Sequence, residues 1–108
     1  MPADSASLKP VTIAGQKCAR VIFIVSNESS GLAHPNWRAN YAFALKVSAA
    51  LDKVAPGLSR GVAIHKGGRF NQQMHDHAII VEIGGTTNTL EEATRSARYV
   101  ARAIAAVL

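Results

Sequence analysis

Apolar runs and amphipathic stretches alternate along this chain. Arg20 to Val25 and Ala78 to Ile83 are continuous apolar runs rich in β-branched residues, a pattern typical of buried strands. Gly61 to His65 is a shorter run of the same kind. Residues 37–55 and 89–108 repeat apolar positions every three or four residues, which predicts helices. The predicted order of elements is therefore β-α-β-β-α.

Both predicted helices carry boundary signals. Asn36 can cap the first helix, which should end before Pro56. Thr89 and Glu92 form a Thr-x-x-Glu capping box that starts the second. The first helix is expected to bury Trp37, Tyr41, Ala44, Leu45, Ser48 and Leu51. The second is expected to bury Leu90, Ala93, Ala97, Val100, Ala101, Ile104 and Leu108.

This order predicts an α/β fold with an open, mostly parallel twisted sheet flanked by helices. The 108 residues make one small domain or part of a larger one. Residues 1–17 are small and polar and contain Pro2 and Pro10, so we expect an irregular lead-in there. The folded part is expected to span residues 18–108.

Composition adds charge to this picture. The net charge of +5 favours anionic partners such as nucleic acid, acidic wall polymers or anionic lipid. The basic residues are dispersed, however, which favours an ordinary soluble basic surface. The single Cys18 can form neither an internal disulfide nor a thiolate cluster, and we expect it to be a small buried side chain. The chain shows no secretory signal and no membrane-length apolar run, so we expect either a cytoplasmic protein or a start downstream of an export segment.

Glu82 is the first candidate for chemistry. It lies near the end of the third apolar run, where burying a charge costs free energy unless the charge is paired or takes part in a reaction. Ligands of α/β folds gather where strands end and helices begin. Gly84 and Gly85 would allow a ligand to approach the backbone closely, and Asn88 adds a polar group. Glu82 could therefore act as a general base on water, although a salt-bridge partner or an exposed edge residue is the alternative.

Other polar residues give less specific signals. His75 and His77 are candidates for a metal pair, but catalytic zinc usually takes three protein ligands and this segment is a predicted loop, so no metal site is recognised. Asn71 and Gln72 lie in a polar loop that could bind peptide or sugar groups or be a simple surface turn. Trp37 could stack on a sugar, although its helical stripe favours core packing. No phosphate loop, nucleophile elbow or nucleic-acid motif occurs.

Three segments taken together resemble the stage II sporulation protein P family, over roughly residues 20–106. The segments are His34–Asn40 with residues 42–45, Pro56–Gly61 leading to Gly68–Gln72, and Ile80–Gly85 with Asn88–Ala93. The resemblance implies a fold similar to zinc-dependent N-acetylmuramoyl-L-alanine amidases. It also implies a peptidoglycan hydrolase that cleaves the amide between muramic acid and the stem peptide. Glu82 would be its catalytic carboxylate. For such an enzyme we expect Arg69, Asn71, Gln72 and Asn88 to bind the substrate.

The resemblance also implies that the family's zinc histidines lie in earlier segments, of the His-Thr-His and Asp-Ile-His-Arg-Asp types, which do not occur here. We therefore expect residues 18–108 to be the C-terminal part of the catalytic domain and the isolated chain to be nearly inactive. The implied partners are peptidoglycan and the stage II sporulation proteins D and M, on the cell-wall side of the membrane, with a missing N-terminal anchor as the membrane link.

Two other readings remain open. The chain could be a non-catalytic wall-binding or regulatory module of the same fold. A basic nucleic-acid binder ranks well behind both, and no nucleic-acid partner is expected.

Overall fold

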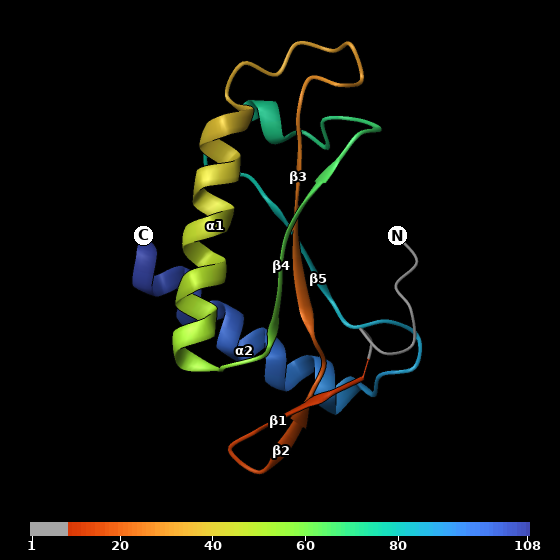
Figure 1. The fold of residues 1–108 in the computed structure, drawn as a ribbon, viewed down its shortest axis with the longest axis vertical. Helices are drawn as coiled ribbons and strands as arrows, with labels where there is room; N and C mark the ends of the chain where they lie inside the picture. The colour runs from red at the N-terminus through yellow and green to blue at the C-terminus, as the bar shows by residue number, and fades with distance from the viewer. Residues whose placement is uncertain (1–8) are drawn as a thin grey trace.

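The fold is built around a three-stranded sheet in the order β4-β3-β5 (Figure 1). The computed structural model describes residues 9–108. β3 (Val21–Ser26) is the central strand, parallel to β4 (Ser59–His65) and antiparallel to β5 (Ile80–Ile83). The α/β class is thus confirmed, but the sheet is mixed rather than mostly parallel. Between β4 and β5 the only helix is the three-residue 3-10 helix η1 (Gln72–Met74), and the chain reverses direction there.

A short hairpin precedes the sheet. β1 (Val11–Ile13) pairs antiparallel with β2 (Gln16–Cys18). The two connecting residues, Ala14 and Gly15, both have positive φ, of 51° and 79°, as a type I′ turn requires. The expectation of an irregular lead-in is therefore wrong for residues 11–17. Residues 1–8, the rest of that lead-in, lie outside the described part of the chain.

Both long helices lie on the same side of the sheet (Figure 1). α1 (Trp37–Val54) connects β3 to β4, and α2 (Leu90–Val107) follows β5 and packs against α1. No helix of the described residues is long and apolar enough to cross a membrane.

The buried face of α1 differs from the predicted stripe. Leu45 is exposed and Trp37 is only partly buried. Trp37 lies in the first turn, where the Arg38 guanidinium lies 4.7 Å from its ring centroid. The buried residues of this helix are Asn40, Phe43, Ala44, Val47, Ser48 and Leu51.

α2 is also rotated relative to its predicted stripe. Its buried residues are Ser96, Val100 and Ala103. The predicted core residues Leu90, Ala97, Ala101 and Leu108 are exposed. The face is displaced because the Ser96 hydroxyl donates to the Ala19 carbonyl, which ties this helix to the chain between β2 and β3.

The core lies between the helices and one face of the sheet. Val21, Phe23 and Val25 point into it and are fully buried. Ile22 and Ile24 alternate with them and lie on the opposite face, each about nine-tenths buried at 7% exposure. Cys18 is buried in the core as predicted, and burial raises the pKa of its thiol. It is therefore a poor nucleophile.

The predicted capping box at the start of α2 is confirmed. Thr89 accepts a hydrogen bond from the Glu92 N–H at 3.1 Å, and the Glu92 carboxylate accepts one from the Thr89 N–H at 3.0 Å. The Asn88 side chain donates to the same carboxylate at 3.2 Å. These hydrogen bonds, the Thr89 N–H first, lower the pKa of Glu92.

This cap makes stability depend on acid pH. A carboxyl group whose pKa is lowered by folding stabilises the fold fully above its unfolded pKa, about 4.3 for Glu. That contribution is lost as the pH falls through the lower folded value.

We expect Glu92→Gln, which keeps the cap geometry without the charge, to flatten the fall in unfolding free energy below about pH 4.3. Urea unfolding at several pH values between 3 and 7 measures how the free energy of unfolding depends on pH. Glu91→Gln, one residue away, should keep the wild-type slope; an unchanged slope for Glu92→Gln would contradict the assignment.

Candidate functional site

Glu82 lies on the face of the sheet that is turned away from the helices. Its neighbours Val81 and Ile83 pack against the core, so strand alternation places Glu82 on the opposite face. The side chain is half-buried. No residue in the described range 9–108 forms a hydrogen bond or ion pair with its carboxylate. The described residues therefore position this carboxylate without pairing it.

The strand register defines what surrounds Glu82. Ile22 lies directly opposite on β3, and Arg20 and Ile24 occupy the diagonal positions, about 7–8 Å away in a regular sheet. Arg20 continues the ladder, because its carbonyl accepts the Gly84 N–H at 2.7 Å. The Arg20 Nε is buried and has no hydrogen-bond partner. The carboxylate thus shares an apolar face with a guanidinium that is itself incompletely paired.

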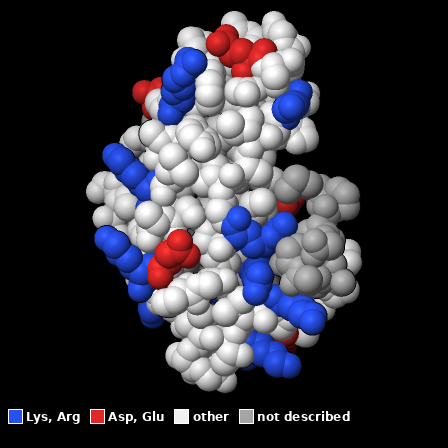
Figure 2. Space-filling view, viewed as in Figure 1, with Lys and Arg blue, Asp and Glu red and all other residues white. Residues whose placement is uncertain are grey.

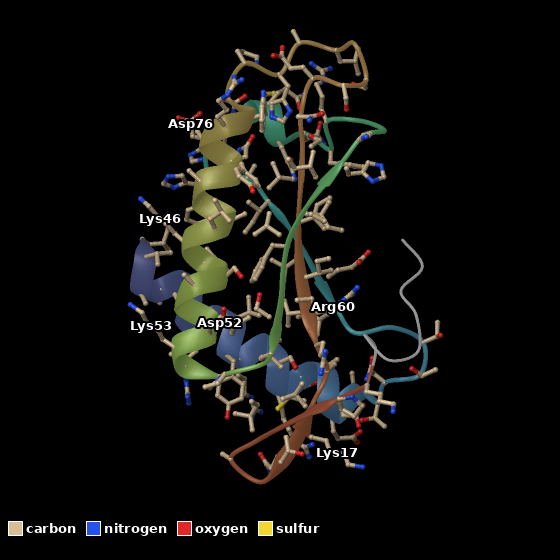
Figure 3. All side chains as sticks on the ribbon, viewed as in Figure 1. Lys17, Lys46, Asp52, Lys53, Arg60 and Asp76 are labelled. Atoms are coloured by element: carbon tan, nitrogen blue, oxygen red, sulfur yellow. The ribbon has the colours of Figure 1, made fainter. Side chains whose placement is uncertain are left out.

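A bulge in β4 adds a second basic residue. Ser59 pairs with Val21 and Val62 pairs with Phe23, so Arg60 and Gly61 together oppose Ile22. Gly61 has a φ of +92°, which a glycine tolerates and most residues do not. Figure 3 shows Arg60 on the side of the strands away from α1. The face around Ile22 is therefore flanked by charged side chains from β4, from β5 and from Arg20, the residue before β3.

The glycines after β5 serve the turn rather than a ligand. Gly84 has a φ of +66°, and a Cβ there would come within 2.6 Å of the Asn88 Oδ1 and 2.9 Å of the Ala19 Cβ. The same Asn88 oxygen accepts the Gly85 N–H at 2.9 Å. The sequence suggested that a ligand approaches the backbone at Gly84 closely, but the side chains of Asn88 and Ala19 occupy that space. Asn88 also links this turn to the cap of α2.

A buried polar network lies at the other end of β3. Gln72 is 1% exposed; its Oε1 accepts the Ser26 N–H at 2.8 Å and its Nε2 donates to the Ile24 carbonyl at 3.0 Å. The amide of Gln72 thus pairs with β3 as another strand would. This arrangement satisfies backbone groups that would otherwise be buried without partners.

His34 joins this network to α1. It is fully buried, with Nε2 2.8 Å from the Asn40 Oδ1 and Nδ1 3.3 Å from the Ser26 Oγ. The Asn40 amide donates to the carbonyls of His75 and Asp76 at 2.7 and 2.9 Å. Because those bonds fix the Asn40 oxygen toward the ring, the His34 Nε2 must carry the proton. The sequence alone did not indicate a role for His34 and Asn40. The signal that could have identified them is a polar residue at a position that faces the core.

The predicted substrate residues do not form one cluster with Glu82. Arg69 donates to the Ala33 carbonyl at 3.2 Å, and Asn71 is exposed in the left-handed conformation at a φ of 60°. Both belong to the loop at the Ser26 end of β3, whereas Glu82 is opposite Ile22. Four residues of strand separate these levels, about 13 Å. Of the four, Asn88 lies at the Glu82 end and Gln72 is enclosed in the network.

The histidine pair does not make a metal site. The His75 and His77 rings lie 5.7 Å apart in an edge arrangement, and the His77 ring stacks on Phe43 at 4.4 Å. The His77 N–H donates to the His75 Nδ1 at 2.9 Å. Within residues 9–108, no three His, Cys, Asp or Glu side chains are grouped to hold a metal ion. The described residues therefore do not fit zinc.

These observations define an α/β domain whose sheet carries, on the face turned away from the helices, one carboxylate that no described residue pairs. The family model described as Stage II sporulation protein P matches residues 3–105. The chain is also 39% identical over 95 residues to the Stage II sporulation protein P of Bacillus subtilis (strain 168), covering 83% of this chain and 22% of that protein. The chain belongs to the stage II sporulation protein P family. No solved structure matches it, so the amidase-like fold stays an expectation.

The buried network predicts a large cost for losing Gln72. Gln72→Ala would leave the Ser26 N–H and the Ile24 carbonyl buried and unpaired, which costs about 1–3 kcal/mol for each group. We expect the free energy of unfolding in urea to fall by about 3 kcal/mol. Met74→Ala is the matched control, since Met74 lies in the same 3-10 helix and is 77% exposed. Equal small losses for the two variants would show that the network does not stabilise the fold.

Proposed function

We propose that this chain supplies the catalytic carboxylate of a peptidoglycan hydrolase of the N-acetylmuramoyl-L-alanine amidase type. The bond cleaved would be the amide between muramic acid and the stem peptide, on the cell-wall side of the membrane during sporulation. The observation that supports this proposal most directly is Glu82, a half-buried carboxylate without a hydrogen bond or ion pair to any described residue. Family membership supports the proposal, because the segment Val81-Glu82-Ile83-Gly84-Gly85 lies within the residues that the family model matches.

The surroundings of Glu82 suit a general base. A base must be held in place and remain free to accept a proton. The strand ladder of β5 fixes its backbone, and Ile22 and Ile24 limit water on one side. In the proposed reaction Glu82 takes a proton from the attacking water and later delivers it to the leaving amine, so the carboxylate is regenerated.

Zinc is part of the proposal only for the longer protein. The described residues contain no suitable donor group, so we propose that zinc ligands are supplied by other segments of the catalytic domain. The chain covers 22% of the curated relative's length, which leaves ample sequence for them. We accordingly propose that the isolated chain hydrolyses peptidoglycan poorly or not at all.

The substrate residues divide into direct and indirect contributors. Arg69, Asn71 and Asn88 are at least partly accessible, and we propose that they contact the glycan or stem peptide. Gln72 would act by holding the loop in place. The stage II sporulation proteins D and M remain proposed partners, and an N-terminal anchor outside this chain remains the proposed link to the membrane.

A non-catalytic wall-binding module is the second candidate. It is favoured by the lack of a three-donor metal group within the described residues. Such a module would bind peptidoglycan without hydrolysis, and replacing Glu82 would leave that binding unchanged.

The test is a chimaera in which this chain replaces the matching segment of the Bacillus subtilis relative. We expect the chimaera to release stem peptides from purified peptidoglycan, and Glu82→Gln to reduce the rate by about 100-fold or more, as loss of a general base does. Release is measured by chromatography of the soluble products. The matched control is Glu91→Gln, which also removes one carboxylate, here from an exposed position, and should keep the rate within about twofold of the parent.

An active chimaera whose rate survives Glu82→Gln would overturn the assignment of the base. A chimaera that binds peptidoglycan but releases nothing, while the unmodified relative is active under the same conditions, would favour the non-catalytic module.

A further inference from the structure

Three arginines line the exposed face of α2. Arg95, Arg98 and Arg102 are three and four residues apart, so their side chains are neighbours along about 10 Å of the helix axis. Like charges at these spacings repel one another and disfavour the helix. Arg95 can be offset by Glu92 and Glu91, three and four residues before it, but no acidic residue of α2 lies at these spacings from Arg98 or Arg102. The stability of α2 therefore does not explain Arg98 and Arg102, whereas a ligand that neutralises them would.

Two of these three side chains are held in place, Arg95 by the hairpin and Arg102 by a neighbouring residue of α2. The Arg95 Nη1 donates to the Lys17 carbonyl at 2.9 Å. The Arg102 guanidinium lies 5.5 Å from the centroid of the Tyr99 ring. Arg98, between them, is exposed and forms no hydrogen bond or ion pair with any residue of the described range. The row is thus fixed at both ends and open in the middle.

The arginines border two adjoining hollows, which together we call the basic groove. One hollow is about 180 Å³ and is lined by Gln16, Arg95, Arg98, Tyr99 and Arg102. The other is about 230 Å³ and is lined by Leu90, Glu91, Thr94, Arg95 and Arg98. Because the two share Arg95 and Arg98, they form one path between the hairpin and the start of α2. Figure 2 shows that Lys and Arg also outnumber Asp and Glu on the lower part of the molecule, where the hairpin lies.

The shape and charge of the groove select among anionic ligands. Guanidinium groups bind phosphate oxygens through paired hydrogen bonds. Single-stranded nucleic acid would require exposed rings for its bases, but Tyr99 is covered by Arg102. A lipid surface would meet a flat or protruding face rather than a groove. Glu91 at one end repels anions, which leaves Arg98 and Arg102 as the stronger binding end.

We propose that the basic groove binds the phosphodiester groups of an anionic wall polymer, a linear chain of polyols joined by phosphate. The choice of a wall polymer rests on the proposed function. Binding at this groove needs no hydrolysis, because it lies on α2 and the hairpin rather than on the sheet face that carries Glu82. It would hold the protein on the wall while that face remains free.

The test is titration of the whole chain with a fluorescent glycerol phosphate oligomer of about ten units, followed by anisotropy at several salt concentrations. We expect the double variant Arg98→Gln/Arg102→Gln to weaken binding about tenfold or more at low salt and to reduce the salt slope by about two. The matched control is Lys46→Gln/Lys53→Gln, which removes the same charge from α1 (Figure 3). It should weaken binding by no more than about twofold.

Equal weakening by the two double variants would overturn the proposal, because diffuse charge would then explain binding. So would tighter binding of polyglutamate, single-stranded DNA or anionic lipid vesicles than of the oligomer, or no binding at low salt. The outcome is independent of Glu82: the Glu82→Gln chain should bind the oligomer like the wild type even if the proposed hydrolysis fails.

Discussion

The structure depends on the burial of β3 on both of its faces. All six residues of Val21–Ser26 are buried, and every other layer is placed by contact with this strand or its ends. The residues that point toward the helices form the core, and β4 and β5 pair with its two edges. Since a one-residue slip would exchange the two faces, the register of β3 decides which side of the sheet carries Glu82.

The two ends of β3 carry different kinds of polar chemistry. At the Ser26 end, Gln72, His34 and Asn40 satisfy one another and the backbone, so the polar groups there stabilise a loop. Near Ile22, Glu82 and the Arg20 Nε are left incompletely paired within the described residues. Single buried side-chain atoms are unpaired at both ends, the Arg20 Nε near Ile22 and the Asn36 Oδ1 and Gln73 Oε1 near Ser26. The feature that distinguishes the Ile22 end is Glu82, a half-buried carboxylate that no described residue pairs.

The sequence predicted the elements better than their arrangement. Long apolar runs and the capping box located β3, β5 and α2, because these signals are local. The hairpin was missed because its turn, Ala14-Gly15, lacks the Asn-Gly or Asp-Gly pair that marks such turns. The direction of β5 and the rotation of both helices depend on contacts distant in sequence, such as the Ser96 hydroxyl with the Ala19 carbonyl.

For the candidate site, the sequence singled out Glu82 because a charge interrupts an apolar strand, and the structure adds that its neighbours face the core while it does not. The roles of Gln72 and Asn88 were not readable in advance. Both looked like ligand contacts because they are amides near glycines or loops, yet their partners are backbone atoms and a cap. An amide side chain carries no local signal that tells these uses apart.

The central claim is that Glu82 is retained for a reaction and not for the fold. The direct measurement is the free energy of unfolding of Glu82→Ile against the wild type, in urea at neutral pH. Because Ile22 lies opposite and β-branched residues suit this position, the account predicts unchanged stability or a gain of up to about 1 kcal/mol. A loss of more than about 1 kcal/mol would contradict it, since the carboxylate would then be part of what holds the sheet together.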